Sequence, residues 1–228
     1  MIELQKVTKR FGLNTFALSD ISLVIESGEF VFIVGPTGSG KTTLLRLLTN
    51  EVIPTSGKVI VDKEDLARIP NSHLTKLRRK VGVVFQDFKL LFDRTVFENI
   101  ALPLEINRIS SKEITPRVEK ILEIVGLVNQ RNLFPTQLSG GETQRAAIAR
   151  AIINEPKIIL ADEPTGNLDP ATGWEIIKLL KDINKRKLAT IIMATHNIDI
   201  VNSLGKRVVR LESGKIIKDQ KEGRYEKS

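Results

Sequence analysis

A glycine-rich loop near the start of the chain constrains the fold more than any other feature. The segment from Gly35 to Thr42 fits the pattern G-x-x-x-x-G-K-[ST]. It follows a strand-like apolar stretch, 30–34, and precedes a leucine-rich stretch, 41–50, with one apolar side. A strand that turns through glycines into a helix holds phosphate well, because loop N–H groups and the helix N-terminus point at the anion. The loop therefore predicts a nucleotide phosphate site in an α/β fold.

The residue types of this loop suggest individual roles. Lys41 can reach the β- and γ-phosphates, and the Thr42 hydroxyl can join the shell of a Mg²⁺ ion. The glycines let the backbone turn so that successive N–H groups face the phosphate oxygens. The residues that we expect to bind the nucleotide here are Gly35, Pro36, Thr37, Gly38, Ser39, Gly40, Lys41, Thr42 and Thr43.

A pair of acidic residues ends a second apolar strand much later in the chain. The stretch 158–161 is apolar and is followed directly by Asp162 and Glu163. We expect Asp162 to bind Mg²⁺, and Glu163 to orient and deprotonate the attacking water. An acidic pair after a strand most often belongs to a helix cap or a loop. When a phosphate loop precedes it in the chain, a catalytic and metal-binding role becomes the better interpretation. The two motifs together predict a P-loop NTPase and leave its subtype open.

Strand-like and helix-like stretches alternate along most of the chain, which favours an α/β core with a largely parallel sheet. The middle has helical periodicity at 114–125 and 142–153, and a further helix is expected over 66–79. A length of 228 residues suits one large domain with an inserted lobe. We expect a single domain, with a catalytic lobe at about 1–87 and 156–228 and a helical lobe at about 88–155.

Composition excludes several classes of protein. The chain has no cysteine, so disulfides, zinc–thiolate sites and cysteine nucleophiles are impossible. Its apolar runs are far shorter than the ~20 residues of a membrane-spanning helix. The N-terminus lacks the plan of a secretory signal, which predicts a cytosolic protein that reaches a membrane through a partner or a surface. The net charge of +8 suggests an anionic partner such as nucleic acid, a membrane surface or nucleotide.

A third motif lies between the other two and fixes the subtype. The segment from Leu138 to Gln144 reads Leu-Ser-Gly-Gly-Glu-Thr-Gln and is a second potential anion site, with a hydroxyl and two glycines at a helix start. It resembles the LSGGQ or LSGGE signature of the ATP-binding-cassette (ABC) ATPases. The resemblance implies a RecA-like P-loop core with an antiparallel β subdomain and an inserted α-helical subdomain. Thr143 departs from the pattern where the family often has glutamine, and we expect it on the exposed side of the signature helix with little consequence.

The resemblance also implies that ATP is used between two chains. In this family two cassettes meet head to tail as an ATP-bound homodimer, and Ser139 and Gly141 of one chain close over the γ-phosphate held by the other. Asp169 matches the D-loop that crosses the dimer seam. The implied contacts with the partner's nucleotide are Ser139, Gly140, Gly141, Glu142 and Asp169.

Further family positions lie after other strands. Gln86 matches the Q-loop glutamine of the Mg²⁺ and water network, and His196 matches the switch histidine that contacts the γ-phosphate. Phe11 falls where the family usually has a tyrosine that stacks on adenine, and its ring keeps the π-face. The resemblance thus implies Glu163, His196, Gln86 and Lys41 as catalytic residues. The implied metal ligands are Thr42, Gln86 and Asp162, with ATP and Mg²⁺ as cofactors. The other histidine, His73, has no such match and is taken as structural.

The resemblance narrows to the cell-division branch of the family, the FtsE-type ATPases. The stretches that carry it are 85–104, Trp174, 193–197 and 223–225. That branch implies a polytopic inner-membrane partner of the FtsX type, a place at the cytoplasmic face of the membrane, and regulation of cell-wall hydrolysis. The stretch 163–169 is shared with ATPases of lipoprotein release and macrolide efflux, which stay open as the alternative.

Two other classes are less well supported. A P-loop nucleotide kinase has no use for the segment from Leu138 to Gln144. A soluble ABC protein that acts on ribosomes or DNA would suit the positive charge, but such proteins generally carry two cassettes or a long coiled-coil insertion. We therefore expect no nucleic-acid partner.

Overall fold

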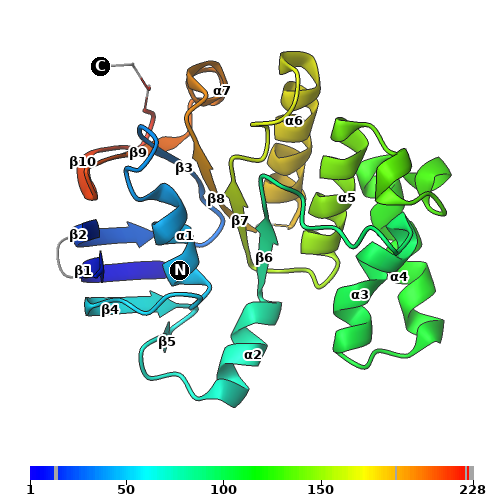
Figure 1. Ribbon diagram of the computed structural model, residues 1–228, viewed down its shortest axis with the longest axis horizontal. Coiled ribbons are helices and arrows are strands. Elements are labelled where there is room, and N and C mark those ends of the chain that lie inside the picture. Colours follow the sequence, from blue (N-terminus) through cyan, green and yellow to red (C-terminus); the bar gives the residue numbers. More distant parts are fainter. Residues whose placement is uncertain (13–14, 188, 224, 226–228) are drawn as a thin grey trace.

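A six-stranded sheet forms the centre of the protein, for which the computed structural model describes residues 1–12, 15–187, 189–223 and 225 (Figure 1). Its strand order is β10-β9-β3-β8-β7-β6. The parallel strands are β3 (Phe30–Val34), β6 (Val81–Val84), β7 (Ile158–Asp162), β8 (Thr190–Thr195) and β9 (Arg207–Glu212), and β10 (Lys215–Gln220) runs antiparallel to β9. Helices or a second sheet cover both faces, so the inner strands are almost continuously apolar.

A second, four-stranded antiparallel sheet packs beside the first. Its order is β2 (Thr15–Ile25), β1 (Ile2–Phe11), β4 (Ser56–Val61) and β5 (Glu64–Asp65). Alternate residues point inward, as in the pair Ile2 and Ile25, and both side chains are fully buried. These side chains share a core with helix α1 (Lys41–Leu48) and one face of the central sheet.

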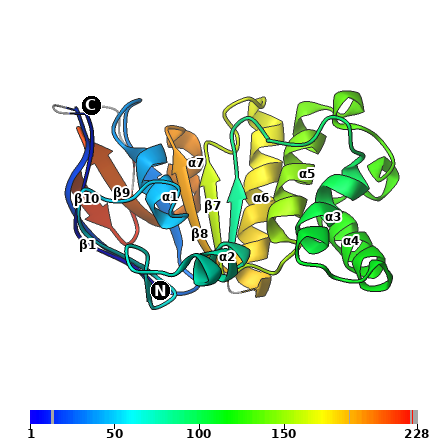
Figure 2. The ribbon, with the colours of Figure 1, turned by 60° about the horizontal axis from the view of Figure 1, so that its bottom comes forward.

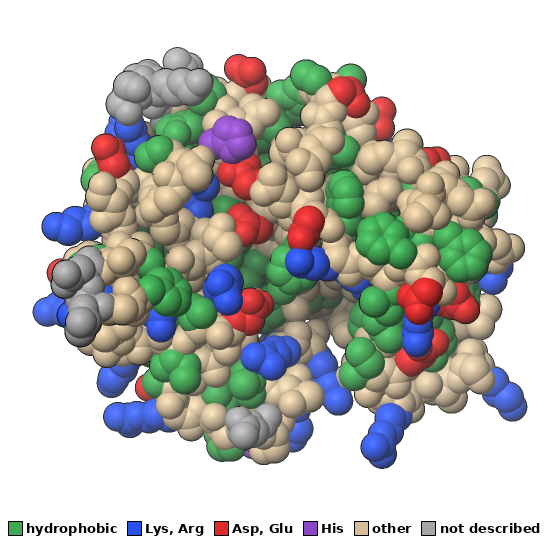
Figure 3. Space-filling view, viewed as in Figure 1, with side chains coloured by type: hydrophobic (Ala, Val, Ile, Leu, Met, Phe, Trp, Pro, Cys, Tyr) green, Lys and Arg blue, Asp and Glu red, His purple; other side chains and the backbone are tan. Residues whose placement is uncertain are grey.

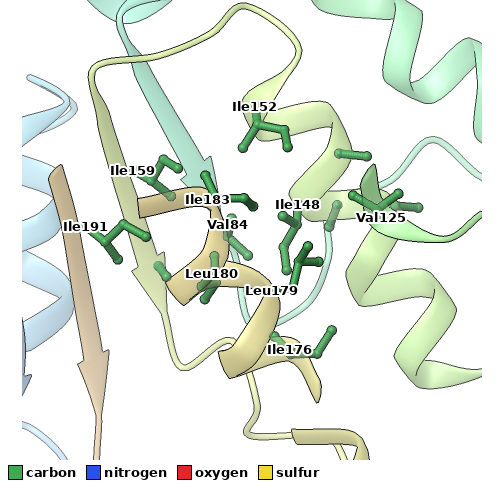
Figure 4. Packing of buried hydrophobic residues seen from close by; sticks show 14 of the residues in the cluster. Val84, Val125, Ile148, Ile152, Ile159, Ile176, Leu179, Leu180, Ile183 and Ile191 are labelled. Atoms are coloured by element: carbon green, nitrogen blue, oxygen red, sulfur yellow. The ribbon is translucent and has the colours of Figure 1, made fainter. Parts of the chain in front are cut away.

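Helices cover the other face of the central sheet and extend beyond it (Figures 1 and 2). In Figure 4, Ile148 and Leu180 of two neighbouring helices meet Val84 and Ile159 of the sheet. The remaining helices are α2 (Asn71–Arg79), α3 (Val96–Ile106), α4 (Ser111–Val125), α5 (Gly140–Ile152), α6 (Pro170–Lys187) and α7 (Ile198–Leu204), with 3₁₀ turns at Val128–Gln130 and Pro135–Gln137.

The predicted fold class is confirmed, including the antiparallel sheet and the helices between the phosphate loop and the acidic pair. The helix expected over 66–79 begins only at Asn71, because Pro70 lies in extended backbone and forms its N-cap. The periodicity of the sequence predicts no separate helix at α3, although Thr95 and Glu98 form a capping box at its start. The limits of the two lobes stay a prediction.

Within the described part of the chain, no helix is both long enough and apolar enough to cross a membrane.

Candidate nucleotide site

The glycine-rich loop takes the close turn that its sequence predicts. Gly40 has a φ of 106°, and a Cβ at this position would lie 2.5 Å from the carbonyl oxygen of Ala17. Helix α1 starts at the next residue, Lys41, so its free N–H groups open toward the loop. A larger residue at position 40 would therefore strain the backbone and push the loop away from strand β2.

Lys41 is held within the loop. Its ammonium donates hydrogen bonds to the carbonyl oxygens of Gly35 at 2.8 Å and Pro36 at 3.1 Å, and the residue is only 8% exposed. Carbonyl oxygens offset the cost of burying a positive charge. The positive charge of Lys41 thus lies beside the backbone N–H groups of the loop, an arrangement that suits a phosphate chain.

An open cleft of about 430 Å³ brings all four predicted catalytic residues together. Lys41 and Thr42 line it from the loop, and Gln86 follows strand β6. The acidic pair ends strand β7, and His196 follows strand β8. All of these strands are parallel, so their carboxyl ends meet at one edge of the sheet. The full lining is Ala17, Thr37, Gly38, Gly40, Lys41, Thr42, Thr43, Gln86, Asp162, Glu163 and His196. On the face drawn in Figure 3, a histidine side chain lies beside acidic ones.

The carboxylate of Asp162 has one oxygen without a hydrogen bond. Its Oδ1 is buried and has no hydrogen-bond partner, while a hydrogen bond from Thr42 reaches the same carboxylate. Burial raises the pKa of Asp162 above its usual value, although the bond from Thr42 and the charge of Lys41 oppose the rise. A partly desolvated carboxylate beside a hydroxyl is a donor set that suits Mg²⁺, which takes few protein ligands and completes its shell with phosphate and water.

Asp162→Asn is expected to stabilise the nucleotide-free protein and abolish its Mg²⁺-dependent ATP binding. A folded-state pKa above the unfolded value of 3.8 means that folding disfavours the ionised carboxylate. The cost is present at neutral pH and vanishes as the pH falls below the unfolded pKa. Thermal unfolding should therefore show a higher Tm for the variant at pH 7, and a smaller difference near pH 4. Asp182→Asn on the exposed side of α6 is the control. A lower Tm at pH 7 would contradict the argument.

Glu163 and His196 form a pair. Nδ1 of His196 lies 2.9 Å from Oε1 of Glu163, whose side chain is 13% exposed, whereas that of His196 is 67% exposed. Glu163 adopts a left-handed backbone with φ 47°, and its N–H donates to the carbonyl of Ala194 at 2.9 Å. A left-handed glutamate is strained, and such strain concentrates at functional sites. The imidazole thus contacts one oxygen of the Glu163 carboxylate.

The signature segment begins helix α5 through a capping box. Ser139 is the N-cap of the helix. The N–H and the hydroxyl of Ser139 both donate hydrogen bonds to Oε2 of Glu142, each at 2.8 Å. These bonds lower the pKa of Glu142, and Gln130 donates to its other oxygen. Gly141 packs so closely on α6 that a Cβ would lie 2.5 Å from Cγ2 of Thr172. The hydrogen bonds between Glu142 and Ser139 and the close packing of Gly141 on α6 thus hold the segment in place.

The signature segment and the D-loop share a second hollow of about 370 Å³, separate from the nucleotide cleft. Ser139, Gly141 and Asp169 all line it. Asp169 also caps helix α6 by accepting the N–H of Thr172 at 3.0 Å, and this interaction with Thr172 lowers its pKa. Within one chain, most of the predicted nucleotide contacts therefore fall into two groups at two hollows. Gly35, Pro36 and Ser39 of the loop line neither hollow, and Ser39 is buried.

Some residues take positions that the motifs did not indicate. Asn167 donates from Nδ2 to the carbonyl of Gln86 at 3.1 Å, which joins the D-loop to the Q-loop. Phe11 ends strand β1 with 43% exposure and a Lys9 ammonium 4.9 Å from its ring centre, and it does not line the cleft. Its stacking on adenine stays a prediction. Ala17 lines the cleft without any sequence signal, because β2 reaches the loop only through tertiary packing. His73 is exposed on α2. The expectation that Thr143 lies on the exposed side of the signature helix is wrong, because Thr143 is only 7% exposed and its hydroxyl donates to the carbonyl of Ser139 at 2.8 Å.

Comparison with known sequences agrees with this geometry. The profile of the family described as "ABC transporter" matches residues 18–166. The cell division ATP-binding protein FtsE of Bacillus subtilis is 48% identical over 225 residues, which span 99% of this chain and 98% of that protein. The methionine import ATP-binding protein MetN 3 of Pectobacterium atrosepticum is 45% identical over 220 residues, 95% of this chain and 64% of that protein.

Known structures share the fold. A dimeric structure of MJ0796, a bacterial ABC transporter cassette, superposes with a TM-score of 0.89 at 40% identity, covering 99% of this chain and 100% of that one. A second dimeric structure of MJ0796, in a post-hydrolysis state with ADP and Pi, also gives a TM-score of 0.89, at 39% identity.

Proposed function

The chain belongs to the ABC transporter family of ATPases, and from that premise we propose that it powers a cell-division complex of the FtsE type. It hydrolyses ATP as a homodimer on the cytoplasmic face of the membrane. Its partner is a polytopic inner-membrane protein of the FtsX type, and the complex regulates cell-wall hydrolysis. The observation that carries this proposal is the 48% identity to FtsE, which extends over 99% of the chain.

Each residue of the cleft has a separate role in ATP hydrolysis. Lys41 and the N–H groups of the loop bind the phosphate chain and stabilise the charge that develops on the γ-phosphate. Glu163 accepts the proton of the attacking water, and His196 keeps that carboxylate oriented. Thr42, Gln86 and Asp162 would hold Mg²⁺, which when bound neutralises charge on the phosphate oxygens.

A single chain holds only half of what the reaction uses. Ser139 and Gly141 open into their own hollow, away from the cleft of the same chain. In a head-to-tail pair they would close over the γ-phosphate of the partner, so that ATP joins the two chains. Hydrolysis removes that contact and lets the pair open. The dimeric MJ0796 cassettes support this arrangement.

Contacts around Gln86 provide a route from the nucleotide to the partner protein. Arg150 of helix α5 donates to the carbonyl of Phe88 at 2.8 Å and also to the carbonyl of Lys89. Asn167 donates a hydrogen bond to the carbonyl of Gln86. The segment after Gln86 is thus fixed both to the signature helix and to the D-loop. A change in either on dimer closure would move it, and a nucleotide-driven equilibrium can bias a bound partner in this way.

The same segment carries exposed apolar side chains that suit a helix of a membrane partner. Leu91 is 38% exposed, Phe92 65%, and the nearby lobe adds Phe134 at 42%. Asn99, fully buried, binds both the N–H and the carbonyl of Leu91 and so fixes the loop. Figure 3 shows large hydrophobic side chains on this part of the molecule. Rigid, exposed apolar groups mark interaction sites.

Isolation of the tagged protein from detergent-solubilised membranes of its own host should test the proposal. We expect a polytopic protein of the division type to co-purify, because Phe92 and its neighbours would pack against a helix of it. Phe92→Asp should reduce its recovery at least about tenfold, since a charge would be buried at the contact. Ile217→Asp on β10, a site with 51% exposure, is the matched control and should leave recovery unchanged.

The second candidate is a cassette of a transporter, which the 45% identity to MetN 3 favours. It would share every catalytic residue, so the identity of the membrane protein decides. Recovery of a methionine permease, or of a lipoprotein-release or macrolide-efflux permease, would replace the division role. Retention of the protein on a nucleic-acid column at about 150 mM salt would instead indicate that its partner is a nucleic acid.

A further inference from the structure

A hollow of about 550 Å³ lies at the edge of the central sheet opposite the nucleotide cleft. Arg79 ends helix α2 just before β6, and Asn154 and Glu155 lie just before β7, so the hollow is at the amino ends of these parallel strands. Its other wall is formed by the end of α3 and by α4. Figure 3 shows the notch between the surface over α2 and that over α3 and α4, with Lys and Arg side chains along it.

The walls are positively charged. Arg79, Arg117 and Lys120 line the hollow, against a single carboxylate from Glu155. Among the described residues, neither Arg79 nor Lys120 makes an ion pair. Arg117 pairs with Glu113 at 3.1 Å, but both side chains are about half exposed and such a pair is weak. These cations are therefore available to an anion.

Helix dipoles account for only one of these three charges. Arg79 is in the last turn of α2, where a cation stabilises the carbonyl end of a helix. Arg117 and Lys120 lie in the middle of α4 and face the hollow three residues apart, one turn along the same side. The helix dipole therefore does not account for their position on this wall.

The floor of the hollow is partly apolar and partly amide. Leu104, Ile121 and Ile153 are buried against it. Asn107 donates from Nδ2 to Oδ1 of Asn154 at 3.1 Å, which joins the end of α3 to the segment after α5. Guanidinium and ammonium groups above amides suit a phosphate, and the aliphatic floor suits a hydrocarbon group attached to it.

We propose that this hollow binds a phosphate ester with an apolar group, held by Arg79 from one wall and by Arg117 and Lys120 from the other. The same chemistry is offered by a soluble phosphorylated metabolite and by the headgroup of an anionic phospholipid. The proposal is independent of the division role, because it rests only on the lining of this hollow.

Binding of n-hexyl phosphate tests the proposal, measured by titration calorimetry below its micelle concentration on protein saturated with MgADP to block the phosphate loop. We expect saturable binding that weakens at least tenfold in Arg117→Gln/Lys120→Gln and in Arg79→Gln. Lys178→Gln/Lys181→Gln removes the same charge at the same spacing on α6 and should leave the affinity within twofold. Hexanol, which lacks the phosphate, should not bind.

A second arm separates the two sources of phosphate. Flotation with vesicles that contain phosphatidic acid should carry the protein upward, and the Arg117→Gln/Lys120→Gln variant should stay behind, if the headgroup is the ligand. Binding of n-hexyl phosphate without flotation identifies a soluble ester instead. The proposal is overturned if no saturable binding occurs, or if the α6 control loses as much affinity as the α4 variant. Thermal unfolding of each variant ensures that a loss is not due to misfolding.

Discussion

Glu163→Gln is expected to bind ATP with native affinity, to accumulate as a dimer, and to lose at least about a hundredfold in turnover. The amide keeps the size of the carboxylate and cannot accept the proton of a water. The carboxylate that it replaces lies at the carboxyl end of β7, 2.9 Å from Nδ1 of His196. The phosphate contacts of the loop are on other residues and remain intact. Phosphate release measures turnover, and size-exclusion chromatography with ATP measures the dimer.

Lys41→Ala is the control, and it should lose activity because it does not bind ATP rather than because it cannot hydrolyse it. It removes the ammonium held by the carbonyls of Gly35 and Pro36, so the variant should bind ATP poorly and stay monomeric. His196→Ala should reduce turnover less than Glu163→Gln, because the histidine positions a base that is still present. Native turnover by Glu163→Gln would show that another group takes the proton, and the assignment of the base would be wrong.

The parts of the site that sequence predicts are those encoded within one segment. The loop from Gly35 to Thr42, the acidic pair and His196 each follow an apolar strand directly. Parallel strands end at one edge of a sheet, so these segments meet wherever the sheet forms. Their convergence on one cleft therefore follows from local patterns and a single rule of topology.

The parts that sequence does not predict depend on tertiary contacts. Nothing in the segments themselves indicates that His196 approaches Glu163 through Nδ1, or that Asn167 binds the carbonyl of Gln86. The pattern over 66–79 predicts one helix, but Pro70 takes an extended backbone and delays the start of α2 to Asn71. Helix α3 carries apolar residues on most sides, so its periodicity is weak even though its capping box is readable.

A mixture of two inactive variants should recover activity if each site is built from two chains. Glu163→Gln keeps its signature segment, and Ser139→Arg keeps its base while its bulk blocks the hollow shared with the D-loop. Each variant alone forms dimers in which both sites are defective. A mixed dimer combines the intact cleft of the Ser139→Arg chain with the intact signature of the Glu163→Gln chain, so one of its two sites is complete.

With random pairing, half of the dimers are mixed, and phosphate release should therefore return to about a quarter of the native rate. Ser139→Arg also removes an N-cap, which costs about 1 kcal/mol, so its thermal unfolding must show that the fold survives. If a chain used its own signature segment, every site in the mixture would still contain one defect and no activity would return. Recovery therefore distinguishes a site completed by the partner chain from one completed within the chain, which the two separate hollows argue against.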